Sequence, residues 1–322
     1  MRFLLDPEQR EFATSLDAML TAADTPSVVQ DWSRGDHASG RALWRRIAEA
    51  GVFALAVPEA YEGLGPRPLE LALGFVELGR HAVPGPLVET VTAATLLASP
   101  DDTGPAKRLL PALAAGETMA TVARDHGFAL DGDAAGIRLS LTAEGLRLAP
   151  GHGPVRSSLD PARRLTPLDP GGELLATDAP LAPALLLARL TTAAQALGVG
   201  LALLDRTVAH VKQRTQFGVP IGSFQAVRHQ LADSKIALEF ARPLVLGAAL
   251  TMTGEDVAAA KVTACEAAYA TARTALQLHG AIGYTAEYDL SLWLTKARAL
   301  RTAWGSPEEC RDTVLSGGGR RW

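Results

Sequence analysis

The C-terminal part of the chain, from about Leu181 to Thr313, is rich in alanine and leucine that recur with a helical period. Apolar residues follow at steps of three and four with polar residues between them, which predicts long amphipathic helices. One such apolar stripe consists of Leu197, Leu201, Leu204, Val208 and Val211. A second long helix is expected from about Asp256 to His279, and its many alanines let neighbouring helices approach closely. The pattern therefore predicts a four-helix bundle.

Two further regions precede this one. Apolar residues from Asp6 to about Ala115 also recur at helical spacing. From about Gly116 to Pro180 short apolar runs alternate with polar residues between turn signals, which is typical of strands. The expected strands cover Met119 to Val122, Ile137 to Leu141 and Leu146 to Leu148, and irregular chain is expected in the last third of this region.

The sequence thus predicts a mainly α fold with a reduced β insert. We expect three domains: an N-terminal helical domain at 1–115, a small middle β domain at 116–180 and a C-terminal helical bundle at 181–322.

Composition narrows the function classes. A net charge of −4 with dispersed lysines and arginines gives no basic surface for nucleic acid or an anionic membrane. The two cysteines, Cys265 and Cys310, match neither a metal-ligand spacing nor a disulfide framework, so no metal is expected. The N-terminus lacks the apolar core of a signal peptide, and no later run is expected to span a bilayer. A reducing cytoplasm is therefore the expected location.

Two stretches of the C-terminal region carry chemistry. The first reads Arg214-Thr-Gln-Phe-Gly-Val-Pro-Ile-Gly-Ser-Phe-Gln225, and the second reads Gln277-Leu-His-Gly-Ala-Ile-Gly-Tyr-Thr-Ala-Glu-Tyr288. Together with the tail Ala303-Trp-Gly-Ser306, they resemble the flavin-dependent acyl-CoA dehydrogenase family. The resemblance implies that both stretches hold FAD across a subunit interface.

For the first stretch, the resemblance assigns a role to each of four residues. Arg214 is expected to bind the FAD diphosphate, because a planar guanidinium can hydrogen-bond two oxygens at once. Gln216 would add an amide hydrogen bond, Phe217 would cover the flavin or its linker, and Gln225 would face the adenosine end. Taken singly, each residue is more simply an exposed helix end or a core anchor, but the whole ordered string favours cofactor binding.

In the second stretch, Gln277 and Gly280 are expected at the adenine and ribose end of FAD. A helix that ends in glycine exposes backbone groups, although a lone glycine there is more often a simple C-cap. Ala281 replaces the second glycine that the family usually has. A single histidine is more often structural than catalytic, so His279 receives no acid–base role.

The reaction that the resemblance implies is α,β-dehydrogenation of an acyl-CoA thioester, which needs a carboxylate base near the substrate α-carbon. The family places that base at one of two positions. Here they hold Trp304 and Ala188, and neither side chain accepts a proton at neutral pH. A displaced base, Glu308 or Glu309, is the alternative that stays open.

The middle region is about half as long as the family's and lacks its recognisable flavin-ring residues. Together with the lost base, this resembles the short subunit of heterotetrameric (α2β2) acyl-CoA dehydrogenases of actinobacterial steroid catabolism. The resemblance implies a longer homologue that supplies the glutamate, a bulky acyl-CoA substrate and an electron-transfer acceptor. Two alternatives remain: a self-sufficient homo-oligomeric flavoenzyme, and a non-catalytic scaffold with the same fold.

Overall fold

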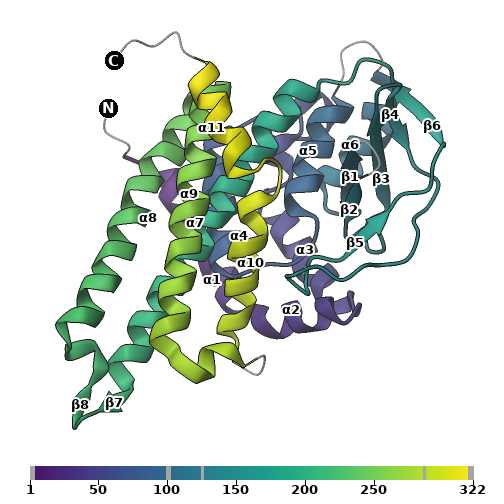
Figure 1. The fold of residues 1–322 in the computed structure, drawn as a ribbon. Coiled ribbons are helices and arrows are strands. Elements are labelled where there is room, and N and C mark those ends of the chain that lie inside the picture. Colours follow the sequence, from purple (N-terminus) through teal and green to yellow (C-terminus); the bar gives the residue numbers. More distant parts are fainter. Residues whose placement is uncertain (1–3, 99–102, 125–126, 286–287, 318–322) are drawn as a thin grey trace. The chain divides into compact units, whose positions relative to one another are not determined.

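The computed structural model describes residues 4–98, 103–124, 127–285 and 288–317. Within these ranges the chain forms eleven α-helices, four 3-10 helices and eight short strands (Figure 1). This confirms the predicted fold class, mainly α with a reduced β insert. The chain divides into two compact units: unit 1 comprises Met1–Thr21, Ala72–Val83 and Arg189–Trp322, and unit 2 comprises Ala22–Leu71 and Pro84–Ala188. The three-domain division of the sequence stays a proposal.

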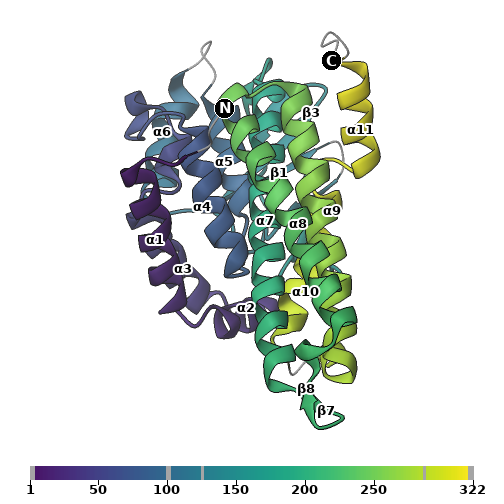
Figure 2. The same ribbon diagram turned by 90° about the vertical axis from the view of Figure 1, so that its left-hand side faces the viewer.

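Unit 1 is helical apart from one small hairpin. Its elements are α1 (Pro7–Thr21), the end of α4 (Pro68–Arg80), most of α7 (Leu181–Gln213), β7 (Thr215–Gln216), β8 (Val219–Pro220), η3 (Ile221–Ser223), α8 (Gln225–Thr251), α9 (Gly254–His279), η4 (Gly280–Tyr284), α10 (Leu290–Thr302) and α11 (Pro307–Ser316). Helix α9 contacts α8, α10 and α11. Figure 2 shows α8 and α9 side by side, with the β7–β8 hairpin at one end of the pair. The predicted helix from about Asp256 to His279 is confirmed as α9.

Helix α7 corrects one expectation. By length and composition it is apolar enough to cross a membrane, whereas the sequence suggested no such run. Every residue from Leu190 to Leu204 is buried. In the most apolar 18-residue segment of the helix, 83% of the residues are buried. The middle of α7 is thus buried on all sides, as in a core helix, and its apolar surface is covered by packing.

Two glycines let α7 and the end of α4 approach closely within unit 1. A Cβ atom on Gly198 would overlap the carbonyl oxygen of Val76, and one on Gly79 would overlap that of Gln195. The helices therefore touch backbone to backbone at this point, which only glycine permits.

Unit 2 joins helices to two small sheets. Its elements are α2 (Thr25–Ser33), α3 (Ala38–Glu49), η1 (Ala54–Ala56), η2 (Glu59–Tyr61), the start of α4, α5 (Leu87–Leu97), α6 (Thr103–Ala114), β1 (Ala120–Arg124), β2 (Phe128–Leu130), β3 (Ile137–Thr142), β4 (Gly145–Leu148), β5 (Leu165–Pro167), β6 (Glu173–Ala176) and the start of α7. The larger sheet has the order β1-β3-β4-β6, with β1 parallel to β3 and the other pairs antiparallel. The smaller sheet pairs β2 with β5, and α5 packs against β1.

Three expected strands are confirmed as β1, β3 and β4. Residues along β3 alternate between buried and half-buried, which is the pattern that predicted it. The expectation of irregular chain in the last third was wrong, because β5 and β6 lie there. These strands are three and four residues long, too short to show a clear alternation, and their pairing partners define them.

Unit 2 contains a fully buried carboxyl group. Asp131 is fully buried, and its Oδ1 accepts hydrogen bonds from Trp32 Nε1 (3.1 Å) and from the backbone N–H of Arg164 (3.2 Å). Its Oδ2 has no hydrogen-bond partner in the described structure. Burial raises the pKa of Asp131 to about 7, against the lowering effect of the Trp32 hydrogen bond. The group is thus poised to titrate near neutral pH.

Candidate functional site

The first predicted stretch begins directly after α7 and runs through the β7–β8 hairpin to the start of α8, and the second covers the end of α9 and η4. Both lie in unit 1. Ala286 and Glu287 of the second stretch lie outside the described residues.

Arg214 is the residue that joins the two stretches. Its Nη1 donates a 2.8 Å hydrogen bond to the backbone carbonyl of His279, the last residue of α9. A guanidinium at a helix C-terminus satisfies an orphan carbonyl and opposes the negative end of the helix dipole. The side chain is half-buried. Its position is therefore set by the protein itself.

Gly280 follows directly and leaves space beside this guanidinium. It has φ 65° and ψ −140°, a conformation open essentially to glycine alone. A Cβ atom here would lie 3.7 Å from Arg214 Nη1 and 3.9 Å from Nη2. Any larger side chain would extend over the arginine, so glycine keeps its face accessible.

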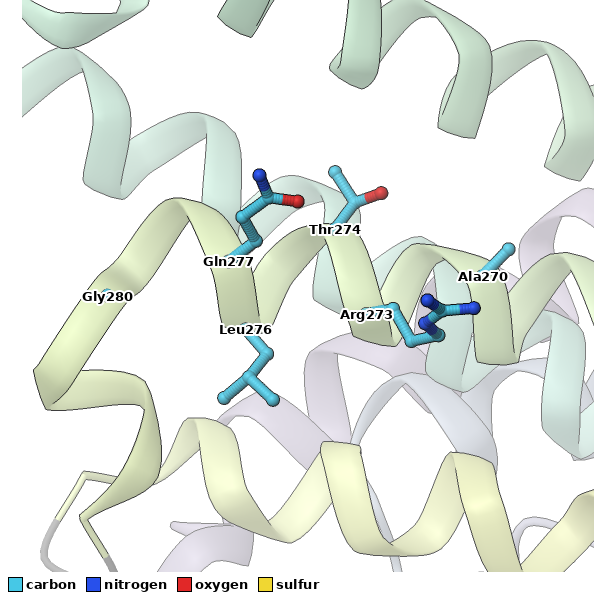
Figure 3. Close-up of a pocket in the computed structure, with 6 residues that line it drawn as sticks. All are labelled: Ala270, Arg273, Thr274, Leu276, Gln277 and Gly280. Atoms are coloured by element: carbon cyan, nitrogen blue, oxygen red, sulfur yellow. The ribbon is translucent and has the colours of Figure 1, made fainter.

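A pocket of about 660 Å³ opens along the same end of α9 (Figure 3). Its described lining consists of Ala270, Arg273, Thr274, Leu276, Gln277 and Gly280. Gln277 is exposed and presents an amide, which can both donate and accept hydrogen bonds. Two of the predicted site residues, Gln277 and Gly280, thus line one pocket, and Arg214 lies against Gly280.

A pair of stacked histidines supports the arginine. His279 and His210 have ring centroids 4.0 Å apart, and His279 Nδ1–H donates to the carbonyl of Ala275 at 2.8 Å. Burial lowers the pKa of His279, and burial together with the neighbouring His279 and Arg214 lowers that of His210. Both rings are therefore neutral near pH 7, and Arg214 carries the positive charge of this cluster.

The hairpin residues lie apart from this pocket lining. Gln216 pairs with Val219, and Phe217 and Gly218 form the two-residue turn between them. Both turn residues have positive φ (53° and 79°), the pattern of a type I′ turn. Phe217 is 91% exposed, and its ring meets that of Phe224 edge-on at 6.2 Å between centroids. Gln225 is exposed at the first position of α8.

The tail position expected for a catalytic base holds a rigid turn. Trp304 has φ 58° and Gly305 has φ 134°. Arg189 Nε donates to the Trp304 carbonyl (3.2 Å), while the buried Lys261 donates through Nζ to the carbonyls of Gly305 (2.7 Å) and Arg301 (3.3 Å). Two cations thus fix the backbone of a turn whose side chain is an indole, which cannot act as a base.

The second base position offers no proton acceptor either. Ala188 is fully buried on α7, and its side chain is a methyl group.

The two carboxylates that follow the turn have other contacts. Glu309 and Ser306 form a capping box at the start of α11: Ser306 N–H donates to Glu309 Oε2 (2.6 Å), and Glu309 N–H donates to Ser306 Oγ (3.2 Å). Glu308 is exposed, and hydrogen bonds from its own backbone N–H and from the Ser306 side chain lower its pKa. The capping box explains Glu309, and the lowered pKa weakens Glu308 as a base.

Sequence reasoning missed Arg273, Thr274 and Lys261. Arg273 lies four residues before Gln277, so helical spacing places both on one face of α9, which is a signal that the sequence contains. Lys261 gave no signal, because its two carbonyl partners lie 40 and 44 residues away.

Known protein families match both helical regions of the sequence. The family models for the acyl-CoA dehydrogenase N-terminal and C-terminal domains match residues 6–117 and 181–318. Acyl-CoA dehydrogenase IpdE2 of Mycobacterium tuberculosis is 33% identical over 310 residues, which cover 94% of this chain and 95% of IpdE2.

Solved structures share the fold over nearly the whole chain. The Tcur3481-Tcur3483 steroid ACAD aligns with a TM-score of 0.80 at 25% identity, covering 97% of this chain and 99% of that one. The ChsE4-ChsE5 complex from Mycobacterium tuberculosis gives a TM-score of 0.82 at 23% identity, with 100% of both chains covered. A Mycobacterium smegmatis glutaryl-CoA dehydrogenase in complex with FADH2 gives 0.81 at 19% identity, covering 98% and 96%. The chain belongs to the acyl-CoA dehydrogenase family.

Proposed function

We propose that this chain is the short subunit of a heterotetrameric, FAD-dependent acyl-CoA dehydrogenase that acts on a bulky, steroid-derived acyl-CoA in the cytoplasm. The observation that carries the proposal is the pairing of an accessible guanidinium, Arg214 beside Gly280, with an indole at the base position. A longer homologue supplies the catalytic glutamate.

The donor groups around the C-terminus of α9 fit the nucleotide half of FAD. Arg214 uses Nη1 toward His279 and has further N–H donors for a diphosphate, and Gly280 adds no side chain that would cover them. The pocket of about 660 Å³ is within the usual size of a ligand site. Gln277 at the pocket wall provides an amide for the ribose or the adenine.

The tip of the β7–β8 hairpin is suited to contact a partner subunit. Phe217 exposes a large apolar ring on a short projecting turn, and an exposed aromatic ring of this kind is typical of a contact with a partner or ligand. Gln216 and Gln225 are exposed on either side of it and supply amide groups. In the proposed complex these residues cover the flavin that the partner subunit holds.

When bound, FAD would supply the acceptor for the hydride that leaves the substrate β-carbon. This chain's residues bind and orient the cofactor: Arg214 neutralises the diphosphate, while Gln277 and Phe217 fix its position. Trp304 takes no proton, so the base comes from the partner. The similarity to the Tcur3481-Tcur3483 steroid ACAD, whose name joins two chains, supports both the heteromeric assembly and the substrate class.

Purification with and without a longer homologue tests the proposal. The expected result is a colourless or insoluble chain when it is expressed alone, and a yellow complex with about two FAD per four chains after co-expression. A purified chain that binds FAD and reduces an electron acceptor with an acyl-CoA would instead be a self-sufficient enzyme. A complex without FAD would be a scaffold.

A further inference from the structure

The pocket on α9 contains an arginine that belongs to neither motif. Arg273 is exposed and lines the pocket one helical turn before Gln277. None of the ion pairs in the described part of the chain includes it. A guanidinium in a ligand-sized pocket without a protein carboxylate is available to a ligand.

Arg273 and Gly280, beside which Arg214 lies, are separated along the pocket wall. Arg214 lies against Gly280, and Arg273 precedes Gly280 by seven residues, about 10 Å along a helix axis at the usual rise per residue. The Arg273 side chain extends toward Ala270, away from Gly280 (Figure 3). A diphosphate held by Arg214 therefore leaves Arg273 for the next part of the ligand.

We propose, on the basis of the function proposed above, that Arg273 binds the adenine of the dinucleotide, with its planar guanidinium stacked on the purine face. Guanidinium planes stack on aromatic rings, whereas the compact ammonium of lysine does not. Gln277, between the two arginines, presents an amide that can bond the adenine edge. The apolar Ala270 and Leu276 complete the described wall. Arg273 thus selects an adenosine-containing ligand over one that ends at the phosphate.

Two probes separate the nucleoside contact from the phosphate contact. The co-expressed complex, stripped of flavin, is titrated calorimetrically with ADP and with inorganic pyrophosphate. Arg273→Ala is expected to weaken ADP binding about threefold to tenfold and to leave pyrophosphate binding unchanged. Arg214→Ala is expected to weaken the binding of both probes. Arg298→Ala, which removes an exposed arginine outside the pocket lining, serves as the matched control and should change neither.

Arg273→Lys decides the kind of contact. Loss of ADP affinity in this variant supports stacking, because lysine keeps the charge but has no planar group to lie on the purine. Recovery of wild-type affinity would make Arg273 a phosphate ligand and overturn the inference. If Arg273→Ala binds ADP with wild-type affinity while Arg214→Ala loses FAD, this inference is overturned and the proposed function stands. A wild-type complex that binds neither FAD nor ADP overturns the proposed function as well.

Discussion

Arg214 Nη1 donates a hydrogen bond of 2.8 Å to the carbonyl oxygen of His279, 65 residues away in the sequence. This bond joins the two stretches that the sequence singled out. His279 is itself buried, stacked on His210 and bonded to Ala275, so the acceptor carbonyl is held firmly. A cation fixed in advance loses little freedom when it binds an anion, which favours tight binding.

Arg214→Ala is expected to weaken FAD binding by the co-expressed complex about tenfold to a hundredfold. The reason is that a desolvated phosphate loses a charged hydrogen-bond partner. The measurement is the flavin absorbance per protein after gel filtration. Lys212→Ala, which removes an exposed cation two residues earlier, should retain the wild-type flavin content. Full flavin content in Arg214→Ala would place the diphosphate elsewhere.

Glu308→Gln and Glu309→Gln are expected to leave turnover of the complex within about twofold of wild type. Neither carboxylate acts as the base in the proposed enzyme, and glutamine also fits a capping box. Removal of a true general base costs about a hundredfold or more. Steady-state turnover with an artificial electron acceptor measures the difference, and a loss of that size in either variant would identify a displaced base.

Glu309→Ala is expected to destabilise unit 1 by about 0.5–1 kcal/mol. The variant removes the acceptor for the Ser306 N–H and half of the capping box. Urea unfolding followed by circular dichroism measures the change, with Glu239→Ala, which removes an exposed glutamate of α8, as the control. Equal midpoints for the two variants would mean that the capping box contributes nothing.

Phe217→Asn is expected to preserve the hairpin and to lose flavin affinity by about 1–2 kcal/mol. Asparagine tolerates a positive φ better than phenylalanine does, so the melting temperature should stay the same or rise. The affinity falls because the aromatic ring is no longer available to be buried. Flavin titration and thermal melting are read together, with Val219→Thr on the same hairpin as the control. Unchanged affinity would remove Phe217 from the site.

Asp131→Asn is expected to flatten the pH dependence of stability between about pH 4 and pH 7. The pKa of Asp131 is raised from 3.8 to about 7, so the folded chain holds this proton more tightly than the unfolded chain. The stability from this group is therefore full below about pH 4 and is lost as pH rises through about 7.

Asparagine keeps an acceptor for Trp32 and also tolerates the positive φ of position 131. At pH 8 the variant should be more stable than wild type by about 1–3 kcal/mol, because no buried charge has to form. Urea unfolding at pH 5 and pH 8 measures the change. Stability should still depend weakly on pH in the variant, because burial also raises the pKa of Glu77 to about 7. An unchanged slope would show that Asp131 does not titrate in this range.

Local patterns predicted most of the fold. The period of the apolar residues predicted α9, and alternation predicted β3, because burial of one face leaves a trace in the sequence itself. The pattern gave no sign of β5 and β6, whose few residues are strands only because β2 and β4 pair with them. Helix α7 looked amphipathic in part, yet packing buries all of its middle residues.

The sequence by itself determined the family resemblance and the two missing bases, because a residue type such as Trp304 or Ala188 limits chemistry wherever it lies. Only the tertiary structure decided that Arg214 meets His279, that Arg273 shares a pocket with Gln277, and that Glu309 caps a helix. Contacts of this kind depend on how distant segments pack and on which groups are left to find a hydrogen-bond partner. That information belongs to the folded chain rather than to any short stretch of it.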